Sequence, residues 1–329
     1  MKAITLTQFG EPDVLRIEER KKPVPKSEEL LIEVHASALN RADLLQRRGK
    51  YPPPEGASDI LGIEIAGQVV ACGDKVENFK PGDRVFGLVG GGGYAEYCVI
   101  DHGLALKIPE NWTYSDAAGV IEAFVTANET IFELGELVSG QSIMIHAGGS
   151  GVGTAGIQMA HLLGAEIWTT AGSEKKIQKA VQLGAKEGIN YKIYDFEKII
   201  LEKNFGQGVD VVEDFIGAGY FEKNLSILKP GGRLIQVGLM RGSRVELDLR
   251  VILDKCVQIK GFILRKRSLE EKRAMVKRFA ERWMSALEKG KIKPIIDSIF
   301  PVSMVQDAHR YMEANSNFGK VVLSWDDLI

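Results

Sequence analysis

Short apolar runs and helix-like segments alternate along residues 142–264, and no other feature constrains the fold as strongly. The strand-like runs are 142–147, 167–171, 188–191, 209–216, 234–239 and 257–264. Segments with helical spacing of apolar residues separate most of them, at 152–163, 174–183, 196–203 and 220–228. Strands separated by helices of this length form a parallel sheet with right-handed crossovers. The pattern predicts an α/β chain whose second part is a doubly wound, six-stranded Rossmann sheet.

The first third of the chain has a different pattern. Runs rich in Val, Ile and Tyr at 30–39, 62–73 and 93–100 are separated by turn sequences such as YPPPEG and KPGDR. This spacing predicts a barrel-like β domain. We expect the last strand-like run, 319–325, to join that domain, because a sheet that already has six strands does not need it. After the first third of the chain a helix is predicted, with Ser115 as a plausible N-cap.

Composition excludes several classes of function. The chain has 329 residues and a net charge of -2, so it has no basic surface for nucleic acid. No apolar run approaches the roughly 20 residues of a membrane helix, and the first residues do not resemble a signal peptide. Three isolated cysteines fit neither a disulfide framework nor a CxxC pair. We therefore expect a cytoplasmic protein without a membrane or nucleic-acid partner.

A glycine-rich loop follows the first strand of the predicted sheet. Two registers fit a dinucleotide motif: the literal G-x-G-x-x-G at Gly151–Gly156, and Gly148–Gly153, in which Ser150 replaces the middle glycine. We favour the second, because it places the turn directly after the strand. A pyrophosphate would then contact the backbone of Gly149, Ser150, Gly151 and Val152. A glycine-rich turn without a ligand is the alternative, and a triphosphate P-loop is disfavoured because no Gly-Lys-Ser/Thr follows.

The end of the second predicted strand lacks the acidic residue of a typical NAD site. That residue binds the ribose 2′-hydroxyl about 20 residues after the glycines. Here the strand ends at Gly172-Ser173, and Glu174 is expected to begin the next helix and point away. Gly172 leaves room for a 2′-phosphate, Ser173 can donate to it, Lys176 (or Lys175) can neutralise it, and Tyr191 can lie beside the ribose. These residues favour NADPH over NADH, unless the segment is only an exposed, capped helix start.

The chain resembles the zinc-independent quinone oxidoreductases of the medium-chain dehydrogenase/reductase superfamily, most of all the p53-inducible type. The resemblance covers nearly the whole chain. It rests on SALNRADLLQRRGKYPPPEGAS, LGIEIAGQV, FKPGDRVFGL, AAGVIEAFVTANETIF, IHAGGSGVGTAGIQMA, TAGSEKKIQKAVQLGA, KNLSILKPGGRLIQVGLM and AHRYMEANSNFGKVVL. It implies a GroES-like catalytic domain at 1–120 and 265–329, and an NADP-binding Rossmann domain at 121–264. It also implies NADPH between the domains and a homodimer (or tetramer) assembled through Val257–Leu264.

Comparison with zinc-dependent relatives implies that this protein binds no zinc. Those relatives carry Gly-His-Glu where this chain has Gly62-Ile63-Glu64, and Ile63 is no ligand. Their cysteine ligand falls near Asn40, and the bend Gly90–Gly93 replaces their four-cysteine lobe. We interpret His146, beside the glycine loop, as a packed residue rather than a ligand.

Without a metal, the site should favour acceptors that take a hydride readily, such as quinones or enones. We expect hydride transfer from C4 of the nicotinamide, with a proton from water or a nearby hydroxyl. Tyr51, with an ordinary pKa of about 10, is the candidate hydrogen-bond donor, and packing in its proline-rich turn is the alternative. Asn40 is a candidate polar contact and Asp43 a candidate orienting group, unless Asp43 only caps local backbone.

The resemblance and the strand ends add further cofactor candidates. They are Val125, Thr126, Phe215, Ile216, Gly238, Leu239, Met240, Phe262, Ile263, Leu264 and Asn317. The predicted activity is NADPH:quinone reduction. Reduction of 2-alkenals or other enones is one alternative, and a non-catalytic NADPH-binding or RNA-binding protein is another.

Overall fold

The computed structural model describes residues 1–326, and the chain forms two compact units. Unit 1 comprises Met1–Val125, Arg265–Glu288 and Pro294–Ile329, and unit 2 comprises Thr126–Leu264 and Lys289–Lys293. Residues 327–329, which end the predicted catalytic domain, lie outside the described residues. The predicted domain boundaries 120/121 and 264/265 stay a prediction, because the two compact units need not be the same as the two domains.

Unit 2 contains a parallel six-stranded sheet, as predicted. Its strands are β8 (Ser142–Ile145), β9 (Glu166–Ala171), β10 (Glu187–Asn190), β11 (Val209–Asp214), β12 (Leu228–Gln236) and β13 (Gln258–Gly261). The order across the sheet is β10-β9-β8-β11-β12-β13, and every neighbouring pair is parallel. This is the order of a Rossmann sheet, and the order reverses between β8 and β11, where such sheets bind ligands.

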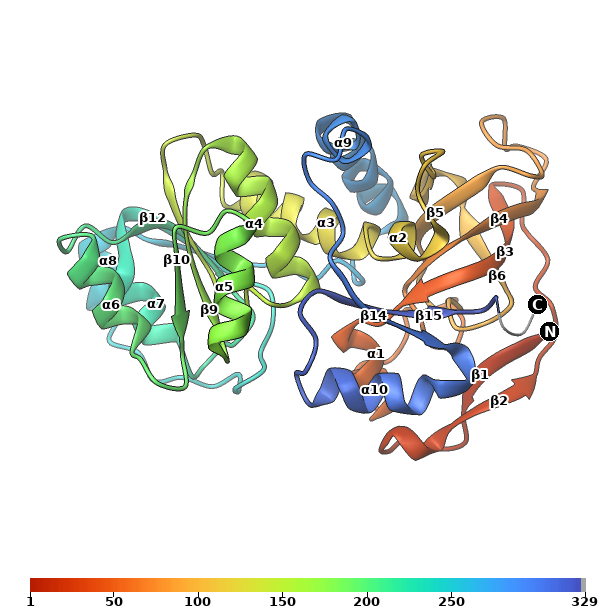
Figure 1. Cartoon of the computed structure of the whole chain (residues 1–329), viewed down its shortest axis with the longest axis horizontal. Coiled ribbons are helices and arrows are strands. Elements are labelled where there is room, and N and C mark those ends of the chain that lie inside the picture. Colours follow the sequence, from red (N-terminus) through yellow and green to blue (C-terminus); the bar gives the residue numbers. More distant parts are fainter. Residues whose placement is uncertain (327–329) are drawn as a thin grey trace. The chain divides into compact units, whose positions relative to one another are not determined.

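Helices cover both faces of this sheet (Figure 1). They are α4 (Gly151–Leu163), α5 (Glu174–Gln182), α6 (Phe196–Lys203), α7 (Phe221–Ile227) and α8 (Arg250–Lys255). On one face, Met144, Trp168 and Val212 of the sheet pack against Phe196 and Leu225 of α6 and α7. Helices α4 and α5 pack on the other face, against strands β8, β9 and β10. The central strands β8 and β11 are almost wholly buried, because helices cover both faces there, whereas the outermost strand β13 is largely exposed.

Unit 1 is built around a seven-stranded, largely antiparallel sheet, which agrees with the predicted β domain. The strands of unit 1, including the separate hairpin β1-β2, are β1 (Lys2–Leu6), β2 (Leu15–Glu19), β3 (Glu29–Ala38), β4 (Glu64–Cys72), β5 (Arg84–Leu88), β6 (Tyr97–Asp101), β7 (Ala105–Lys107), β14 (Ile296–Pro301) and β15 (Lys320–Ser324). The sheet order is β14-β15-β3-β4-β5-β7, with β6 paired to β3. Strand β15 pairs antiparallel with β3, so the prediction for the last strand is confirmed.

The remaining helices are α1 (Arg41–Arg47), α2 (Tyr114–Ala118), α3 (Ile121–Ala127), which continues into the π-helical segment Asn128–Leu134, α9 (Leu269–Glu288) and α10 (Val305–Glu313). The prediction that Ser115 is the N-cap was wrong, because Ser115 lies inside α2. Thr113 caps α2, because its hydroxyl accepts the Asp116 N–H at 3.0 Å and the Asp116 carboxylate accepts the Thr113 N–H at 3.1 Å.

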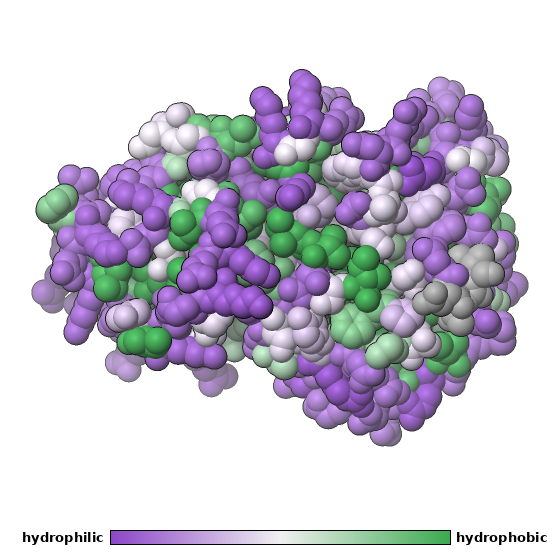
Figure 2. Space-filling model, viewed as in Figure 1, coloured by the Kyte–Doolittle hydropathy of each residue, from purple (hydrophilic) through white to green (hydrophobic). Residues whose placement is uncertain are grey.

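The molecular surface is mixed in polarity. On the face drawn in Figure 2, hydrophilic residues predominate and apolar residues form small groups among them. Among residues 1–326, no helix is long and apolar enough to cross a bilayer.

Candidate active site

The glycine loop joins β8 to α4 and exposes unpaired backbone donors. Ser150 is the N-cap of α4, and its hydroxyl accepts the Gly153 N–H at 2.9 Å. The N–H groups of Gly149, Gly151 and Val152 donate to no other residue in the described part of the chain. These donors and the positive end of a 13-residue helix form a site for an anion.

Other glycines of the loop allow close packing. A Cβ on Gly148 would lie 2.0 Å from the Thr169 hydroxyl, and a Cβ on Gly153 would lie 2.5 Å from the Ala147 carbonyl oxygen. A Cβ on Gly156 would lie 2.7 Å from Ile131 Cδ1. The literal motif Gly151–Gly156 lies within α4, and the register Gly148–Gly153 spans the turn.

A second group of candidate residues lies where β9 and β10 end. A Cβ on Gly172 would lie 2.9 Å from the Tyr191 hydroxyl and 3.3 Å from Cε of Lys192. Ser173 caps α5, where its hydroxyl accepts the Lys176 N–H at 3.4 Å. Glu174 begins α5, and Asn190 Nδ2 donates to its carboxylate at 3.0 Å. The structure thus brings Gly172, Ser173, Lys176 and Tyr191 to one edge of the sheet.

Two cations near Tyr191, Lys192 and Arg241, were not predicted from the sequence. The Arg241 guanidinium lies 5.4 Å from the centre of the Tyr191 ring. Lys192 directly follows Tyr191, so its position after the third strand was a usable signal. Arg241 comes from the loop after β12, and only the order of the strands brings that loop near.

The loops after β11 and β12 also meet at this edge. Asp214 ends β11, and its carboxylate accepts the N–H groups of Ile216 at 2.7 Å and Gly217 at 3.0 Å. The Gly238 N–H donates to the Asp214 carbonyl at 3.2 Å, and the Met240 N–H donates to the Phe215 carbonyl at 3.2 Å. Segments 215–216 and 238–240 therefore lie side by side, with the side chains of Leu239 and Met240 exposed.

The other cofactor candidates are dispersed. Val125 and Thr126 are buried neighbours in α3 that belong to different units. Phe262 and Leu264 after β13 are buried, whereas Ile263 is exposed. In unit 1, Asn317 Nδ2 donates to the Gly319 carbonyl at 2.7 Å, just before β15.

His146 is a packed residue, as interpreted from the sequence. Its imidazole is fully buried, with Nε2 2.7 Å from the Asn224 side-chain oxygen and Nδ1 3.0 Å from the Thr170 hydroxyl. Burial lowers the pKa of His146. The ring packs against Phe196 and Tyr220.

In unit 1, Asn40 belongs to a buried ionic cluster. Lys320 Nζ donates to Glu64 Oε1 at 2.7 Å, to Asn40 Oδ1 at 2.8 Å and to the Leu39 carbonyl at 2.9 Å. Asn40 Nδ2 donates to Glu64 Oε1 at 2.8 Å. The second Glu64 oxygen accepts the Glu122 N–H at 3.0 Å. The ammonium and both carboxylate oxygens are therefore satisfied, as a buried ion pair requires.

Asp43 lies next to this cluster and caps α1. Its buried carboxylate accepts the N–H groups of Asn40 at 2.8 Å and Gly62 at 3.1 Å, and the Tyr94 hydroxyl at 3.3 Å. Burial raises the pKa of Asp43 to about 6, although these backbone bonds lower it. These contacts correspond to the backbone-capping alternative for Asp43.

Tyr51 is half-buried in the same unit. The Arg265 guanidinium lies 5.2 Å from the centre of its ring. Burial, and then the charge of Glu122, raise the pKa of the phenol. Within residues 1–326 the Tyr51 hydroxyl has no hydrogen-bond partner, so it is not bonded to Asn40 or Asp43.

The described residues contain no group of three or more His, Cys, Asp or Glu side chains that could hold a metal ion. Ile63 is 2% exposed and packs in the core. The cysteines Cys72, Cys98 and Cys256 are all free thiols.

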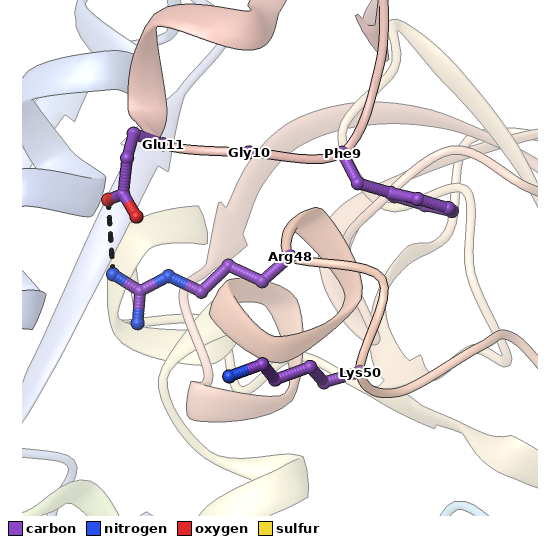
Figure 3. Close-up of a pocket in the computed structure, with 5 residues that line it drawn as sticks. All are labelled: Phe9, Gly10, Glu11, Arg48 and Lys50. Atoms are coloured by element: carbon purple, nitrogen blue, oxygen red, sulfur yellow. Dashed lines mark hydrogen bonds and ion pairs between the residues drawn. The ribbon is translucent and has the colours of Figure 1, made fainter.

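A surface pocket lies between the loop after β1 and the end of α1 (Figure 3). Phe9, Gly10, Glu11, Arg48 and Lys50 line it. Arg48 is already paired with Glu11 at 3.1 Å and with Glu313 at 3.0 Å. The pocket contains none of the predicted site residues, and we assign it no role.

Comparisons with known proteins agree with both units. Residues 26–110 match the alcohol dehydrogenase GroES-like domain, and residues 151–281 match the zinc-binding dehydrogenase family. The quinone oxidoreductase of Rattus norvegicus is 32% identical over 326 residues, which cover 98% of this chain and 97% of the relative. The chain belongs to the quinone oxidoreductase family. The human relative is 31% identical over the same shares of both chains.

Solved structures of this family have the same fold. The Escherichia coli quinone oxidoreductase complexed with NADPH has a TM-score of 0.89 at 27% identity, covering 98% of this chain and 100% of the other. The CurK enoyl reductase has a TM-score of 0.88 at 29% identity, covering 98% of each chain. The expected superfamily, the GroES-like and Rossmann fold and the oxidoreductase class are confirmed. Membership of the p53-inducible type stays a prediction.

Proposed function

We propose that this protein is an NADPH-dependent quinone reductase that works without a metal. The proposal rests on two candidate anion sites at the carboxyl ends of the strands of the Rossmann sheet. One consists of the three unpaired amides of the glycine loop, and the other is the space beside Gly172, near which cationic side chains lie. Both lie in a chain that is 32% identical to quinone oxidoreductases. When bound, NADPH supplies a hydride from C4 of its nicotinamide.

The residues of unit 2 fit this cofactor. The amides of Gly149, Gly151 and Val152, next to Ser150, would bind the pyrophosphate. Ser173 and Lys176 would hold the 2′-phosphate above Gly172, with Tyr191 beside the ribose and Lys192 and Arg241 adding positive charge. Segments 215–216 and 238–240 would contact the nicotinamide half. The assignments of Val125, Thr126, Phe262, Ile263, Leu264 and Asn317 stay predictions.

The residues of unit 1 suit the acceptor. Tyr51 would donate its unpaired hydroxyl to the oxygen that gains negative charge during reduction. Asn40 has its side chain held by Glu64 and Lys320, so its role is to position the backbone before α1. Asp43 fixes the same backbone from the other side.

Independence from zinc is part of the proposal. Ile63 offers no ligand atom, and the Asn40 oxygen already accepts the Lys320 ammonium. We expect the purified enzyme to contain less than about 0.1 zinc per chain, a substoichiometric amount for a structural or catalytic site. Elemental analysis measures this, and activity after dialysis against a chelator should equal that of untreated enzyme.

A second candidate is NADPH-dependent reduction of enones. Similarity to the CurK enoyl reductase favours it, because the same hydride chemistry applies to a differently shaped acceptor. A non-catalytic NADPH-binding or RNA-binding role is the third candidate, and RNA filter binding at two salt concentrations tests it.

We also propose a homodimer (or tetramer) through Val257–Leu264. Strand β13 ends the sheet, and its outer edge pairs with no described strand, so a second copy could continue the ladder. The cytoplasmic location stays a prediction.

The decisive experiment follows cofactor oxidation with ortho-quinones, para-quinones and 2-alkenals, each with NADPH and with NADH. We expect the largest kcat/KM with NADPH and a quinone. A preference for NADH would overturn the assignment of Gly172, Ser173 and Lys176. A preference for 2-alkenals would favour the second candidate.

A further inference from the structure

Three polar side chains of unit 1 have unpaired groups. They are the Tyr51 hydroxyl, the Glu122 carboxyl group and Nη1 of Arg265, none of which has a partner within residues 1–326. Arg265 is only 6% exposed. Its other groups are satisfied: Nη2 donates to Gln46 Oε1 at 2.6 Å, and Nη2 and Nε both donate to the Gly90 carbonyl. A buried guanidinium N–H without an acceptor is costly, which points to a ligand atom that completes the site.

Helix α1 links these groups. Arg265 donates to Gln46 of α1, and Asn40, which precedes α1, donates to the same Glu64 carboxylate that accepts the Glu122 N–H. The Arg265 guanidinium lies 5.2 Å from the centre of the Tyr51 ring, and the charge of Glu122 raises the pKa of the Tyr51 phenol. Glu122 lies in the first turn of α3, and its N–H donates to Glu64 at 3.0 Å. The backbone of Glu122 is thus fixed beside the Lys320–Glu64 pair, while its carboxyl group stays available.

Several groups around Glu122 shift the pKa of its carboxyl group. Burial raises the pKa of Glu122 to about 8, and the negative charges of Glu64 and Asp43 act in the same direction. Lys320 and Arg265 oppose them. The remaining titratable groups that interact with Glu122 are Tyr51 and Lys272. A neutral carboxylic acid in this position can donate a proton, which a solvated glutamate cannot do at pH 7.

We propose that Glu122 is the proton donor of the reaction, and that Arg265 and Tyr51 hold the acceptor oxygen. This inference rests on the proposed reductase function and names the source of its proton.

The quinone ring gains a hydride, and its electron pair leaves a quinolate oxygen negatively charged while the nicotinamide is oxidised. Tyr51 and Nη1 of Arg265 donate hydrogen bonds to that oxygen. The carboxyl O–H bond of Glu122 breaks and a new O–H bond forms on that oxygen. The ring C–H bond made by the hydride then loses its proton to solvent and the other carbonyl oxygen takes up a proton, so the ring becomes the aromatic hydroquinone. The Glu122 carboxylate regains its proton from water.

The first test is Glu122→Gln, which keeps the shape and removes the proton. We expect kcat to fall about 100-fold, as for the loss of a general acid. In the wild-type enzyme kcat should fall as the pH rises above about 8, because Glu122 then loses its proton. In the variant, kcat should not vary over this pH range. The Kd for NADPH, measured by fluorescence titration, should stay within about twofold of the wild-type value.

The matched control is Glu222→Gln, because Glu222 is an exposed glutamate in the first turn of α7. It should leave both kcat and its pH profile unchanged. A Glu122→Gln enzyme that keeps the wild-type kcat and pH profile would overturn the assignment of the donor.

A second test needs no turnover. Titration of 4-nitrophenolate, a coloured analogue of the quinolate, into cofactor-free protein should show binding that Arg265→Lys weakens at least about tenfold, since lysine lacks the planar fork. Equal binding by both proteins would overturn the oxygen site. A protein that binds 4-nitrophenolate through Arg265 but reduces no quinone would contradict the proposed function alone. Quinone reduction that is insensitive to Glu122→Gln would contradict the donor alone.

Discussion

At the scale of single residues, Gly172 decides what fits beside Tyr191. A Cβ at this position would lie 2.9 Å from the tyrosine hydroxyl, so any larger residue would displace the ring. Cε of Lys192 borders the same space, and the Glu174 carboxylate nearby is bonded to Asn190. We propose that the positive charge and the free space beside Gly172 together favour NADPH over NADH.

Lys176→Glu should separate these cofactors. Reversing the charge beside a 2′-phosphate should raise the Kd for NADPH about 10- to 100-fold, or about 1.4–2.7 kcal/mol, and change that for NADH by less than about threefold. Fluorescence titration measures both constants. Lys198→Glu, on the exposed side of α6, is the control and should change neither. Equal losses for both cofactors would remove Lys176 from the phosphate site.

Tyr51→Phe should lower kcat for quinones about 100-fold, as for the loss of one donor to an oxyanion. The hydroxyl makes no hydrogen bond within residues 1–326, so the melting temperature should not change. Tyr194→Phe, at another tyrosine with an exposed ring, is the matched control. Unchanged kinetics in Tyr51→Phe would make Tyr51 a packing residue of its proline-rich turn.

At the scale of elements, β15 brings a lysine into the first half of unit 1. Strand β15 begins at Lys320, whose ammonium contacts the segment before α1 and the start of β4. Neither Glu64 nor Asn40 has another cation within hydrogen-bond distance among residues 1–326. The pairing of β15 with β3 is therefore fixed by charge as well as by the strand ladder.

Lys320→Met should destabilise the protein by about 3–5 kcal/mol, because it leaves the Glu64 carboxylate buried without its counter-ion. Urea denaturation measures the loss. The double variant Lys320→Met/Glu64→Gln should lose clearly less than Lys320→Met, since no buried charge is left. A single variant as stable as the wild type would show that the pair contributes nothing.

Most elements of unit 2 could be predicted from sequence, because their apolar residues recur with the period of a helix or a strand. The short helix α8, which buries no residue, was not predicted. Ser150 and Ser173 cap helices α4 and α5, a role that was not predicted for Ser150 from the sequence. Lys192, Arg241, Glu122 and Arg265 were not predicted as site residues. Their significance depends on neighbours far away in sequence, and a glutamate near the start of a helix usually indicates only a favourable helix dipole.

At the scale of the whole molecule, buried acids make stability depend on pH in an unusual direction. Glu213 is fully buried, with Thr130 donating to one oxygen and no described partner for the other. Burial raises its pKa from 4.5 to about 8. The folded protein therefore keeps this proton at pH values where the unfolded chain has released it, and stability falls as the pH rises from 4.5 to 8. Asp43 and Glu122 act in the same direction.

Glu213→Gln should remove part of this dependence. Between pH 5 and pH 8, the variant should lose at least about 1.4 kcal/mol less stability than the wild type, the equivalent of one pKa unit. Urea denaturation at the two pH values measures the difference, with Glu222→Gln as the control. Parallel pH profiles would show that Glu213 is ionised in the folded protein.

The proposed pairing of two copies through strand β13 also belongs to the scale of the whole molecule. If copies pair through β13, Ile259→Arg should shift the protein to a monomer, because it places a charge on the edge strand at a side chain that is 41% exposed. Sedimentation equilibrium measures the change, which should raise the dimer Kd at least about 100-fold. Ile193→Arg, at an isoleucine that is 66% exposed, should leave assembly intact. A monomeric wild-type protein would contradict the proposed interface.

The position of Lys320 also has a consequence for biosynthesis. A ribosome completes the contiguous stretch Thr126–Leu264 well before it adds the lysine that neutralises Glu64. Until then, Glu64 lacks the ammonium group that is hydrogen-bonded to it in the folded protein. Chaperone binding to arrested chains that end before residue 320 should therefore concentrate on the N-terminal segment rather than on the nucleotide-binding fold.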